Sequence, residues 1–370
     1  MKEIRLLILT PNPVESASTR YRIAQYLPFL ANAGITGTIA PFISTELFQE
    51  IYRPGLTPRK IAQLLDAVRQ RFQLLLTAGQ YEAVFISREI MTLGPPLLEW
   101  LFARVVRLPL IFDFDDATWV SYSSPTYGNL VRLIKPPAKT SQIIRFSSAV
   151  IAGNRHLAAY ASQYNPQVTI IPTVVDPTLF NPQPRHAAPR NLPVVGWIGS
   201  HSIAQYLRLI TNALASVGKR HPFIFRVIGA GREISLEGVR VENRSWQMET
   251  EFADFCDLDI GVYPIIADEW SAGKCAFKAI QYQAAGVACL ASAVGMNREV
   301  IDSGRNGILV EDDEGWMAAL EHLLTQPEIR RKMGDAGRES VIRHYSLQVH
   351  APGLVEVIHR VVALHARRQS

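Results

Sequence analysis

The sequence has few cysteines, and this scarcity excludes two classes of protein. Among its 370 residues there are three cysteines, Cys256, Cys275 and Cys289. Their spacing matches no metal site, and three thiols cannot cross-link a chain of this length. We therefore expect neither a cysteine metal site nor a disulfide-stabilised secreted fold. The cysteine content suits a reducing compartment, which predicts a cytoplasmic protein.

Long hydrophobic runs are also lacking. No run approaches the roughly 20 apolar residues that a membrane-spanning helix needs. The N-terminal stretch MKEIRLLILTPNP has an apolar run too short for a signal peptide, and we interpret it as a first buried strand. Hydrophobic residues make up 48% of the chain and charged residues 19%. These values are ordinary for a globular protein and exclude a disordered chain or a collagen-like repeat.

Basic charge exceeds acidic charge only modestly, but it is clustered. The formal net charge is +5. Residues 51–75 contain five basic side chains against one acidic one, and residues 131–145 contain four basic side chains and no acid. Such runs are typical of a solvated helix face, and the alternative is a patch that contacts anionic lipid or an anionic substrate. No nucleic-acid-binding motif accompanies the charge, so no nucleic-acid partner is expected.

Short apolar runs alternate with helical patterns along the whole chain, which predicts an α/β fold. The predicted strands are IRLLILT, AVFIS, PLIFDF and AVIAG in the first half, and VVGWIG, FIFRVIG, LDIGVYP, VACLAS and NGILV in the second. Near-continuous apolar strands separated by helices indicate parallel sheets covered on both faces. In the first helical pattern, residues 18–35, Pro28 predicts a kink or a break into two short helices, and Gly34 predicts the end.

A proline-rich stretch between Pro172 and Pro193 predicts a division into two domains. We predict an N-terminal, acceptor-binding Rossmann-like domain at residues 1–172, a linker at 173–192 and a C-terminal Rossmann-like domain at 193–346. A C-terminal helix at 347–370 is expected to pack back on the N-terminal domain. Two doubly wound domains side by side would place a cleft between the carboxyl ends of both sheets, where open α/β folds bind ligands.

The stretch GKCAFKAIQYQAAG, which begins at Gly273, carries two lysines at the predicted start of a helix. Lysines usually favour helix ends, where the backbone carbonyl groups are negative. Lys274, Lys278 and Gln281 would share one helix face, and Gly273 would leave the first backbone amides open. Together these features predict a site for a polyanion such as a diphosphate. The alternative interpretation is two surface lysines on an amphipathic helix.

A second turn of small residues follows the first predicted strand of the same domain, in VVGWIGSHSIAQYL. Gly199 and Ser200 would let the backbone approach a ligand closely, and Ser202 is a candidate N-cap for the next helix. A plain capped turn is the alternative. FRVIGAGREI begins like a dinucleotide-binding pattern, but Ile234 stands where a third glycine is needed, so a nicotinamide cofactor is not expected.

In their order and spacing these segments resemble the nucleotide-binding domain of GT-B glycosyltransferases, specifically the retaining enzymes of family 4. VGWIGS is similar to the family's first strand and phosphate loop, and FRVIGAG to its strand ending in Gly-x-Gly. VRVENRSWQ, which contains Trp246, is similar to the loop that holds the nucleobase. The segments DLDIGVYP, GKCAFKAIQYQAAGVACLASAVGMNREVI and NGILVEDDEG follow in the family's order. ASTRYRIAQYLPFL and VIAGNRHLAAY resemble first-domain segments, so the resemblance spans essentially the whole chain.

One departure from the family pattern concerns two glutamates eight positions apart, the first facing the sugar hydroxyls and the second holding the ribose. Gly273 and Gln281 stand at these positions. Gln281 keeps the capacity to hydrogen-bond a ribose diol, whereas Gly273 has no side chain. Three interpretations stay open: Glu269 or Asp268 replaces the first glutamate, the lysines shift the task toward the phosphates, or the protein binds a nucleotide sugar but transfers it poorly.

The acceptor is expected on the first domain, where loops at the carboxyl ends of the strands carry polar residues. Ser18, Thr19 and Arg20 follow the first predicted strand. Arg88 and Glu89 stand at the end of another strand, and for these two a position in the cleft and a structural ion pair are equally open.

IFDFDDATW adds three carboxylates, Asp113, Asp115 and Asp116. They are a candidate site for a divalent ion. We favour helix capping and contacts of Asp115 or Asp116 with acceptor hydroxyls or Arg88, because the nucleotide signals stand in the other domain. His156 begins a predicted helix and is interpreted as structural.

The resemblance implies a retaining glycosyltransferase that moves a sugar from a nucleotide-diphosphate donor to a glycan, lipid-linked or polysaccharide acceptor. Lys278 and Lys274 would neutralise the leaving diphosphate, with Glu269 as a third catalytic candidate, and no metal or other cofactor is expected. The alternatives are a non-catalytic nucleotide-sugar-binding subunit and a sugar-nucleotide epimerase of the same fold. The basic runs suggest peripheral attachment to the inner face of an anionic membrane.

Overall fold

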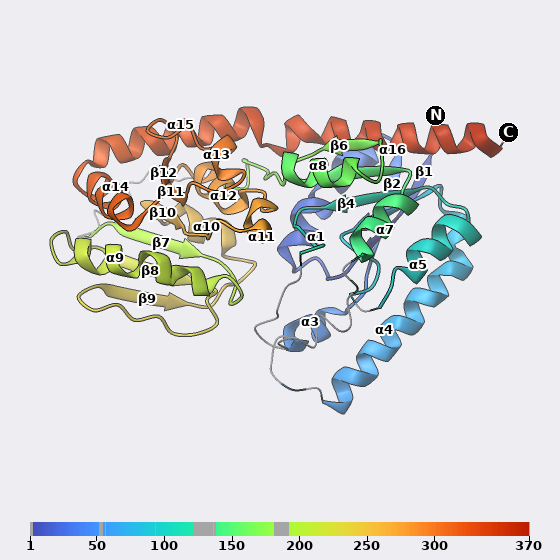
Figure 1. Cartoon of the computed structure of the whole chain (residues 1–370), viewed down its shortest axis with the longest axis horizontal. Helices are drawn as coiled ribbons and strands as arrows, with labels where there is room; N and C mark the ends of the chain where they lie inside the picture. The colour runs from blue at the N-terminus through green and yellow to red at the C-terminus, as the bar shows by residue number, and fades with distance from the viewer. Residues whose placement is uncertain are drawn as a thin grey trace. The chain divides into compact units, whose positions relative to one another are not determined.

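The computed structural model describes residues 3–51, 55, 57–92, 94–120, 136, 138–180 and 192–369. Most of the predicted linker (181–191), Arg53 of the first basic run and residues 131–135 of the second lie outside the described residues. The chain forms two compact units: unit 1 comprises Met1–Thr173 and His350–Ser370, and unit 2 comprises Val174–Val349. Each unit is built on one six-stranded sheet (Figure 1).

Unit 1 contains a parallel sheet in the order β2-β1-β3-β4-β5-β6. The strands are β1 (Ile4–Thr10), β2 (Ile35–Pro41), β3 (Ala83–Ser87), β4 (Leu110–Phe114), β5 (Ala149–Ala152) and β6 (Val168–Ile170). Every residue of β3, β4 and β5 is buried, as expected for strands with helices on both faces. The four strands predicted for the first half are confirmed. β2 and β6, which have few buried residues, were not predicted.

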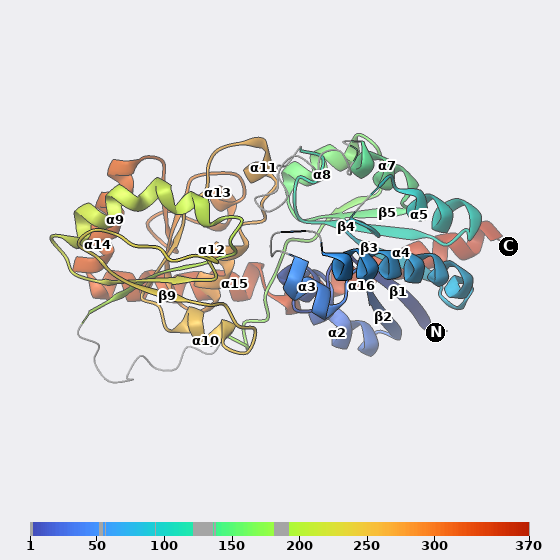
Figure 2. The same ribbon diagram turned by 90° about the horizontal axis from the view of Figure 1, so that it is seen from below.

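Helices cover both faces of this sheet, and Figure 2 shows α7 and α8 on one side of it and α2 on the other. The helices of unit 1 are α1 (Ala17–Arg22), η1 (Ala24–Tyr26), α2 (Leu27–Asn32), α3 (Thr45–Ile51), α4 (Pro58–Thr77), η2 (Ala78–Gln80), α5 (Leu97–Trp100), η3 (Leu101–Val105), α7 (Lys139–Phe146) and α8 (Arg155–Ser162). The C-terminal helix α16 (Leu347–Gln369) belongs to unit 1 from His350 onward, and Arg360 donates to Thr169 of β6 at 3.3 Å. Within the described part of the chain, no helix is both long and apolar enough to cross a membrane.

The predicted break at Pro28 is confirmed. The helical pattern divides into α1, η1 and α2, and the backbone leaves helical geometry at Ile23 (φ −144°). Pro28 stands in the first turn of α2, where its missing N–H costs no helical hydrogen bond. Gly34 follows α2 with φ +76°, a left-handed conformation that glycine adopts without strain.

Unit 2 contains a second parallel sheet, in the order β12-β11-β10-β7-β8-β9. The strands are β7 (Val194–Ile198), β8 (Ile224–Ile228), β9 (Arg240–Arg244), β10 (Ile260–Tyr263), β11 (Ala288–Ser292) and β12 (Ile308–Val310). The five strands predicted for the second half are confirmed. β9 is an additional edge strand with charged residues at alternate positions, a pattern that protects a sheet edge from pairing with other chains.

The helices of unit 2 are η4 (Ala204–Ile210), α9 (Thr211–Gly218), α10 (Glu251–Cys256), α11 (Glu269–Ala272), α12 (Phe277–Ala284), α13 (Asn297–Val300), α14 (Asp313–Thr325) and α15 (Pro327–His344). One core cluster joins η4, α9 and α14 to the sheet around the buried side chains of Trp197, Phe225 and Leu323. The predicted fold class, two doubly wound parallel α/β sheets, is thereby confirmed.

Each sheet contains a point where the strand order reverses direction. In unit 1 this point lies between β1 and β3, and in unit 2 it lies between β7 and β10. The chain segments that follow the two central strands turn toward opposite sides of the sheet at this point. The loops at the carboxyl ends of these strands therefore diverge and leave room for a ligand. In unit 2 these loops are the turn after Ile198 and the segment after Tyr263.

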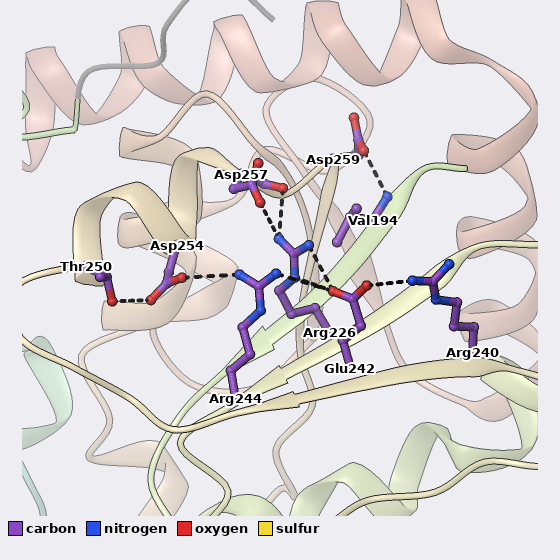
Figure 3. A network of polar contacts seen from close by, with 9 residues as sticks. All are labelled: Val194, Arg226, Arg240, Glu242, Arg244, Thr250, Asp254, Asp257 and Asp259. Carbon is purple, nitrogen blue, oxygen red and sulfur yellow. Dashed lines mark hydrogen bonds and ion pairs between the residues drawn. The ribbon is translucent and has the colours of Figure 1, made fainter. Parts of the chain in front are cut away.

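The charged face of β9 is part of a network of arginines and carboxylates (Figure 3). Arg226 of β8, which is buried, donates to Glu242 of β9 at 3.0 and 3.1 Å and to Asp257 at 2.5 Å. Arg240 and Arg244 approach the same Glu242 carboxylate from the two flanking positions of β9, each at 3.4 Å. The buried guanidinium is therefore compensated by two carboxylates, as burial of a charge requires.

Replacing Arg226 by methionine will leave Glu242 and Asp257 without their buried partner. Both carboxylates keep some contact with water, so we expect a loss of about 2 kcal/mol of unfolding free energy, below the range for fully buried pairs. Urea denaturation will measure it. Arg240→Met is the matched control, because its side chain is 67% exposed and contacts the same carboxylate; a change of at most about 0.5 kcal/mol is expected there. Equal losses in the two variants would contradict this account of the network.

Candidate functional site

Two glycine turns meet at the carboxyl edge of the unit 2 sheet. Gly199 follows β7, and its N–H donates to Ile228 O at 3.0 Å. Gly229 follows β8 with φ +81°, and a β-carbon there would lie 2.2 Å from Gly199 O. A β-carbon on Gly231 would lie 2.9 Å from the His201 β-carbon. Glycine is therefore required by contact between the two turns as well as by backbone conformation, and the turns present backbone at the reversal point of the sheet.

The prediction that Ser202 caps the following helix is wrong. This helical segment begins as the 3₁₀ helix η4, with Ile203 at the N-cap position and no side-chain cap among the described residues. Ser200 O accepts from the N–H groups of Ile203 and Ala204, both at 3.1 Å. The Ser202 hydroxyl lies 2.8 Å from the Ser200 hydroxyl. Both hydroxyls are thus in the turn after β7, beside Gly199.

Lys274 and Lys278 do not share one helix, which corrects the prediction from the sequence. The short helix α11 ends at Ala272 with Gly273 as its C-cap, and Lys274 N–H still donates to Ser271 O at 3.0 Å. Ala276 then adopts a left-handed conformation with φ 51°, so α12 begins only at Phe277. Lys274 lies in the turn between the helices, with its Nζ 4.9 Å from the ring centre of Trp270. Lys278 lies in the first turn of α12.

The ammonium group of Lys278 is held by side chains from two helices. Its Nζ donates to Gln281 Oε1 at 2.8 Å, and Gln281 Nε2 donates to Glu251 Oε1 of α10 at 3.3 Å. Nζ also lies 5.2 Å from the ring centre of Phe255 and 5.9 Å from that of Phe277. Gln281 is 0% exposed and Glu251 is 2% exposed, whereas Lys278 is half-buried. A buried carboxylate is thus linked through an amide to a cation at the protein surface.

This arrangement bears on the predicted role of Gln281. Its side chain is fully buried, and in this structure it orients Lys278. The predicted contact between Gln281 and a ribose stays a prediction. The sequence did not indicate the partnership of Gln281 with Glu251 or that of Lys278 with Phe255, because these partners are more than 20 residues away and α10 gives no local signal for either contact.

The remaining predicted donor residues surround the same edge of the sheet. Trp246 follows β9 and is half-buried, and its β-carbon would lie 3.2 Å from a β-carbon on Gly229. Asp268 caps α11 by accepting from Ser271 N–H at 2.7 Å, so its carboxylate already has a structural task. Glu269, in the first turn of α11, is exposed. Both carboxylates proposed to replace the missing glutamate are exposed, and Asp268 has a capping role in α11.

In unit 1 the predicted residues Arg88, Asp115 and Asp116 come together. Arg88 Nε lies 2.7 Å from Asp115 Oδ1, and its Nη2 lies 2.7 Å from Asp116 Oδ2. Burial lowers the pKa of Arg88, but the facing carboxylates of Asp115 and Asp116 outweigh this effect and raise its pKa above the ordinary value. Arg88 also has φ 64°, a strained conformation for an arginine that the two ion pairs help to hold. The ion-pair interpretation of Arg88 is thereby supported.

The divalent-metal alternative for this aspartate cluster finds no support. Asp113 binds the buried Arg22 through both of its oxygens, and Arg22 also donates to Ile171 O at 2.8 Å. Asp115 and Asp116 bind Arg88, so each carboxylate faces a cation. Among the residues that the structure describes, no group of three or more metal-binding side chains is arranged to hold an ion.

Helix α1, which follows the loop after β1, carries the three remaining acceptor candidates. Thr19 is 0% exposed, and its hydroxyl donates to Asn12 O at 2.8 Å, so it joins α1 to the loop that precedes it. Ser18 is half-buried, with its hydroxyl 3.1 Å from that of Ser16. Arg20 donates to Glu15 O at 3.2 Å. Ser18 and Arg20 keep surface that a ligand can reach, whereas Thr19 does not.

Comparison with known proteins agrees with this arrangement. Residues 192–326 match the family model described as "Glycosyl transferases group 1". No curated protein sequence matches the chain. A similar solved structure is sucrose-phosphate synthase from Thermosynechococcus elongatus, with 16% identity and a TM-score of 0.69 over 98% of this chain and 100% of that one. Anabaena HepE in complex with UDP and glucose has 14% identity and a TM-score of 0.68 over 97% of this chain and 100% of that one. WaaG, a glycosyltransferase involved in lipopolysaccharide biosynthesis, has 14% identity and a TM-score of 0.62 over 96% of this chain and 99% of that one. The chain therefore has the GT-B fold, as its sequence predicted.

The contact between the glycine turns predicts a difference between two alanine variants. Gly286→Ala places a side chain in open space at φ +67°. It should therefore lose only the free energy needed to hold alanine in a left-handed conformation, about 1 kcal/mol of unfolding free energy. Gly229→Ala adds a clash with Gly199 O and forces the two turns apart. We expect it to cost more than twice as much in urea denaturation. If both variants lose the same stability, the turns are not in the contact described.

Proposed function

We propose that this protein, a GT-B fold chain with a glycosyl transferases group 1 domain at residues 192–326, transfers a sugar from a nucleoside-diphosphate donor to a glycan or lipid-linked acceptor. The observation that carries the proposal is the half-buried ammonium group of Lys278, fixed at the start of α12 by Gln281. Anabaena HepE, which has the same fold, is bound to UDP and glucose in its structure. WaaG acts in lipopolysaccharide biosynthesis, which supports a glycan or lipid-linked acceptor.

The donor is proposed to bind at the carboxyl edge of the unit 2 sheet. The Gly199–Ser200 turn would bring its backbone close to the diphosphate, and Trp246, a half-buried aromatic side chain beside Gly229, would contact the base. Lys278 and Lys274 would supply positive charge to the phosphates from two different segments. Glu269, which is exposed in the first turn of α11, is the proposed partner of the sugar hydroxyls.

Charge development explains why a positioned lysine matters for such a reaction. As the glycosidic bond to the diphosphate breaks, positive charge develops on the sugar and negative charge on the leaving phosphate. An ammonium group already oriented toward the phosphate stabilises that charge without reorganisation at the moment of reaction. With lysines neutralising the leaving group, the proposal needs no metal ion. Transfer with retention at the sugar carbon is proposed from the resemblance to family 4.

A non-catalytic nucleotide-sugar-binding protein is the second candidate. It is favoured by one observation: Gly273 stands where the family has a glutamate. Glycine has no side chain and Gly273 is buried, so this position offers no carboxylate to a sugar. This candidate predicts donor binding without turnover. An epimerase, in contrast, would convert the donor with no acceptor present.

Replacing Lys278 by alanine should lower kcat for sugar transfer by about 100-fold or more, in the range seen when one charge-stabilising donor is removed. Folding should be little affected, because the side chain is only half-buried. The measurement is release of nucleoside diphosphate from a panel of nucleotide sugars, with thermal unfolding in parallel. Lys332→Ala, an exposed lysine on α15, is the control and should keep full activity.

The same assay separates the candidates. Unchanged transfer in Lys278→Ala would contradict the role of this lysine. Donor binding without release of diphosphate in the unmodified protein would favour the non-catalytic candidate, and formation of an epimer would favour the epimerase.

Attachment to an anionic membrane is also proposed, through helix α4. Four large apolar side chains of this helix, Ile61, Leu65, Phe72 and Leu76, are 45%, 66%, 39% and 86% exposed. Their spacings of four, seven and four residues place them on one face, which we call the apolar stripe. Exposed Arg59 and Arg69 lie on the same helix. An exposed apolar face with nearby arginines is the pattern of a helix that lies in the surface of an anionic bilayer.

Charge placed in the apolar stripe should abolish this attachment. We expect Leu65→Glu/Leu76→Glu to reduce co-sedimentation with vesicles of phosphatidylcholine and phosphatidylglycerol by at least about tenfold, since two glutamates oppose both burial and lipid charge. Ile342→Glu, on α15 of unit 2, replaces an equally apolar side chain that is 46% exposed and should bind like the unmodified protein. Binding that ignores both the substitutions and the lipid charge would contradict the proposal.

A further inference from the structure

A pocket of about 550 Å³ opens in unit 1 between α4, the start of α3 and the end of β2. Its volume lies in the range of small-molecule sites. None of the residues proposed above to bind the donor or the acceptor lines this pocket. It therefore needs an explanation of its own, and the chemistry of its walls indicates what it could bind.

Uncharged amides and hydroxyls form the polar wall of the pocket. Gln63, Gln70 and Gln73 line it from α4, and Ser44 and Thr77 add hydroxyl groups. Spacings of seven and three residues keep the three glutamines on one side of the helix. Gln63 Oε1 is buried, and no partner for it exists among the described residues. A buried acceptor without a hydrogen bond costs free energy, which a hydroxyl group in the pocket would recover once the amide turns toward it.

The two charged side chains that line the pocket, Arg71 and Asp66, are already hydrogen-bonded within the protein. Arg71 is 2% exposed, and its Nε and two Nη groups donate to backbone carbonyl oxygens at 3.1, 2.7 and 2.7 Å. Asp66 accepts from Arg69 at 2.7 and 2.9 Å and from Gln70 at 2.6 Å. An ionic ligand would lose its hydration and find little accessible charge in exchange, because the Arg71 guanidinium is buried and Asp66 is held by Arg69. The pocket therefore fits a neutral ligand with many hydroxyl groups.

The floor of the pocket is apolar. Phe42, Leu47 and Ala67 line it and belong to one small core cluster, with exposures of 3%, 1% and 7%. A pyranose ring has an apolar face of C–H groups and a rim of hydroxyls. An apolar floor beside a wall of amides matches these two surfaces in one ligand.

We propose that this pocket binds a neutral sugar unit of the acceptor. The proposal rests on the proposed transfer to a glycan or lipid-linked acceptor. Helix α4 supports it, because the apolar stripe and the glutamine face adjoin on its surface: Gln73 and Leu76 stand three residues apart, about 60° around the helix. A helix lying in the bilayer surface by its stripe would hold the pocket next to the headgroups, where the sugar of a lipid-linked acceptor is found.

Titration with neutral disaccharides tests the proposal directly. The probes are maltose, cellobiose and N,N′-diacetylchitobiose, added to the full-length protein and followed by saturation-transfer NMR and calorimetry. We expect saturable binding of at least one of them. Gln63→Leu/Gln73→Leu removes two amides of the wall and should weaken that binding at least about tenfold, the loss expected for two neutral hydrogen bonds. Gln80→Leu is the matched control, because Gln80 is exposed and outside the pocket.

A second variant guards against a folding defect in the first. Gln73→Trp changes an exposed residue and fills the mouth of the pocket, so it should abolish disaccharide binding while thermal unfolding stays unchanged. Binding that survives both variants, or the absence of binding for all three disaccharides at millimolar concentration, would overturn the proposal. UDP titration of the same samples reports on unit 2 separately. Loss of disaccharide binding with UDP binding intact thus concerns the pocket, whereas failure of UDP binding concerns the proposed donor.

Discussion

The ammonium group of Lys278 is held in place by a buried amide, and the proposed chemistry depends on that contact. A lysine side chain has four rotatable bonds, so an unrestrained one would sample many positions and pay for its ordering when a ligand arrives. Here Gln281 accepts from Lys278 and donates to Glu251, and the ring of Phe255 lies close to the cation. A cation fixed before the substrate binds can stabilise developing charge at little entropic cost.

The backbone determines where this cation stands. Left-handed Ala276 separates the turn that carries Lys274 from the helix that carries Lys278, so the two ammonium groups come from different segments. Parallel strand order in unit 2 then brings the loops after β7 and β10 to one edge of the sheet. The same edge holds the glycine turns, Trp246 and the start of α11. Each of these follows the carboxyl end of a strand, directly or after a connecting loop.

Much of the fold was predictable from the sequence, because parallel sheets require nearly continuous apolar strands. Runs such as AVFIS and VACLAS are buried along their whole length, and all nine predicted strands are present. The break at Pro28 was also predictable, since proline lacks the N–H that a helix interior needs. The strands β2, β6 and β9 escaped prediction because they lie toward the sheet edges and contain polar or small residues instead of a continuous apolar run.

The site was less predictable than the fold. A helical wheel placed Lys274 and Lys278 on one face, but it could not foresee that Ala276 leaves the helical conformation, because alanine ordinarily favours helix. Ser202 was a reasonable cap by residue type, yet the chain enters a 3₁₀ helix two residues later and its hydroxyl bonds with that of Ser200. The partners Glu251 and Phe255 come from a distant helix, and tertiary contacts of this kind leave no periodic signal. The contact of Arg88 with Asp115 and Asp116 could be predicted from the sequence, because the carboxyl ends of adjacent parallel strands lie side by side.

A crystal structure of the protein with UDP bound tests the central claim most directly. The account predicts that the diphosphate lies at the carboxyl edge of the unit 2 sheet, within hydrogen-bonding distance of Lys278 Nζ and beside the turn of Gly199 and Ser200. UDP bound with its phosphates remote from Lys278, or bound only in unit 1, would contradict it.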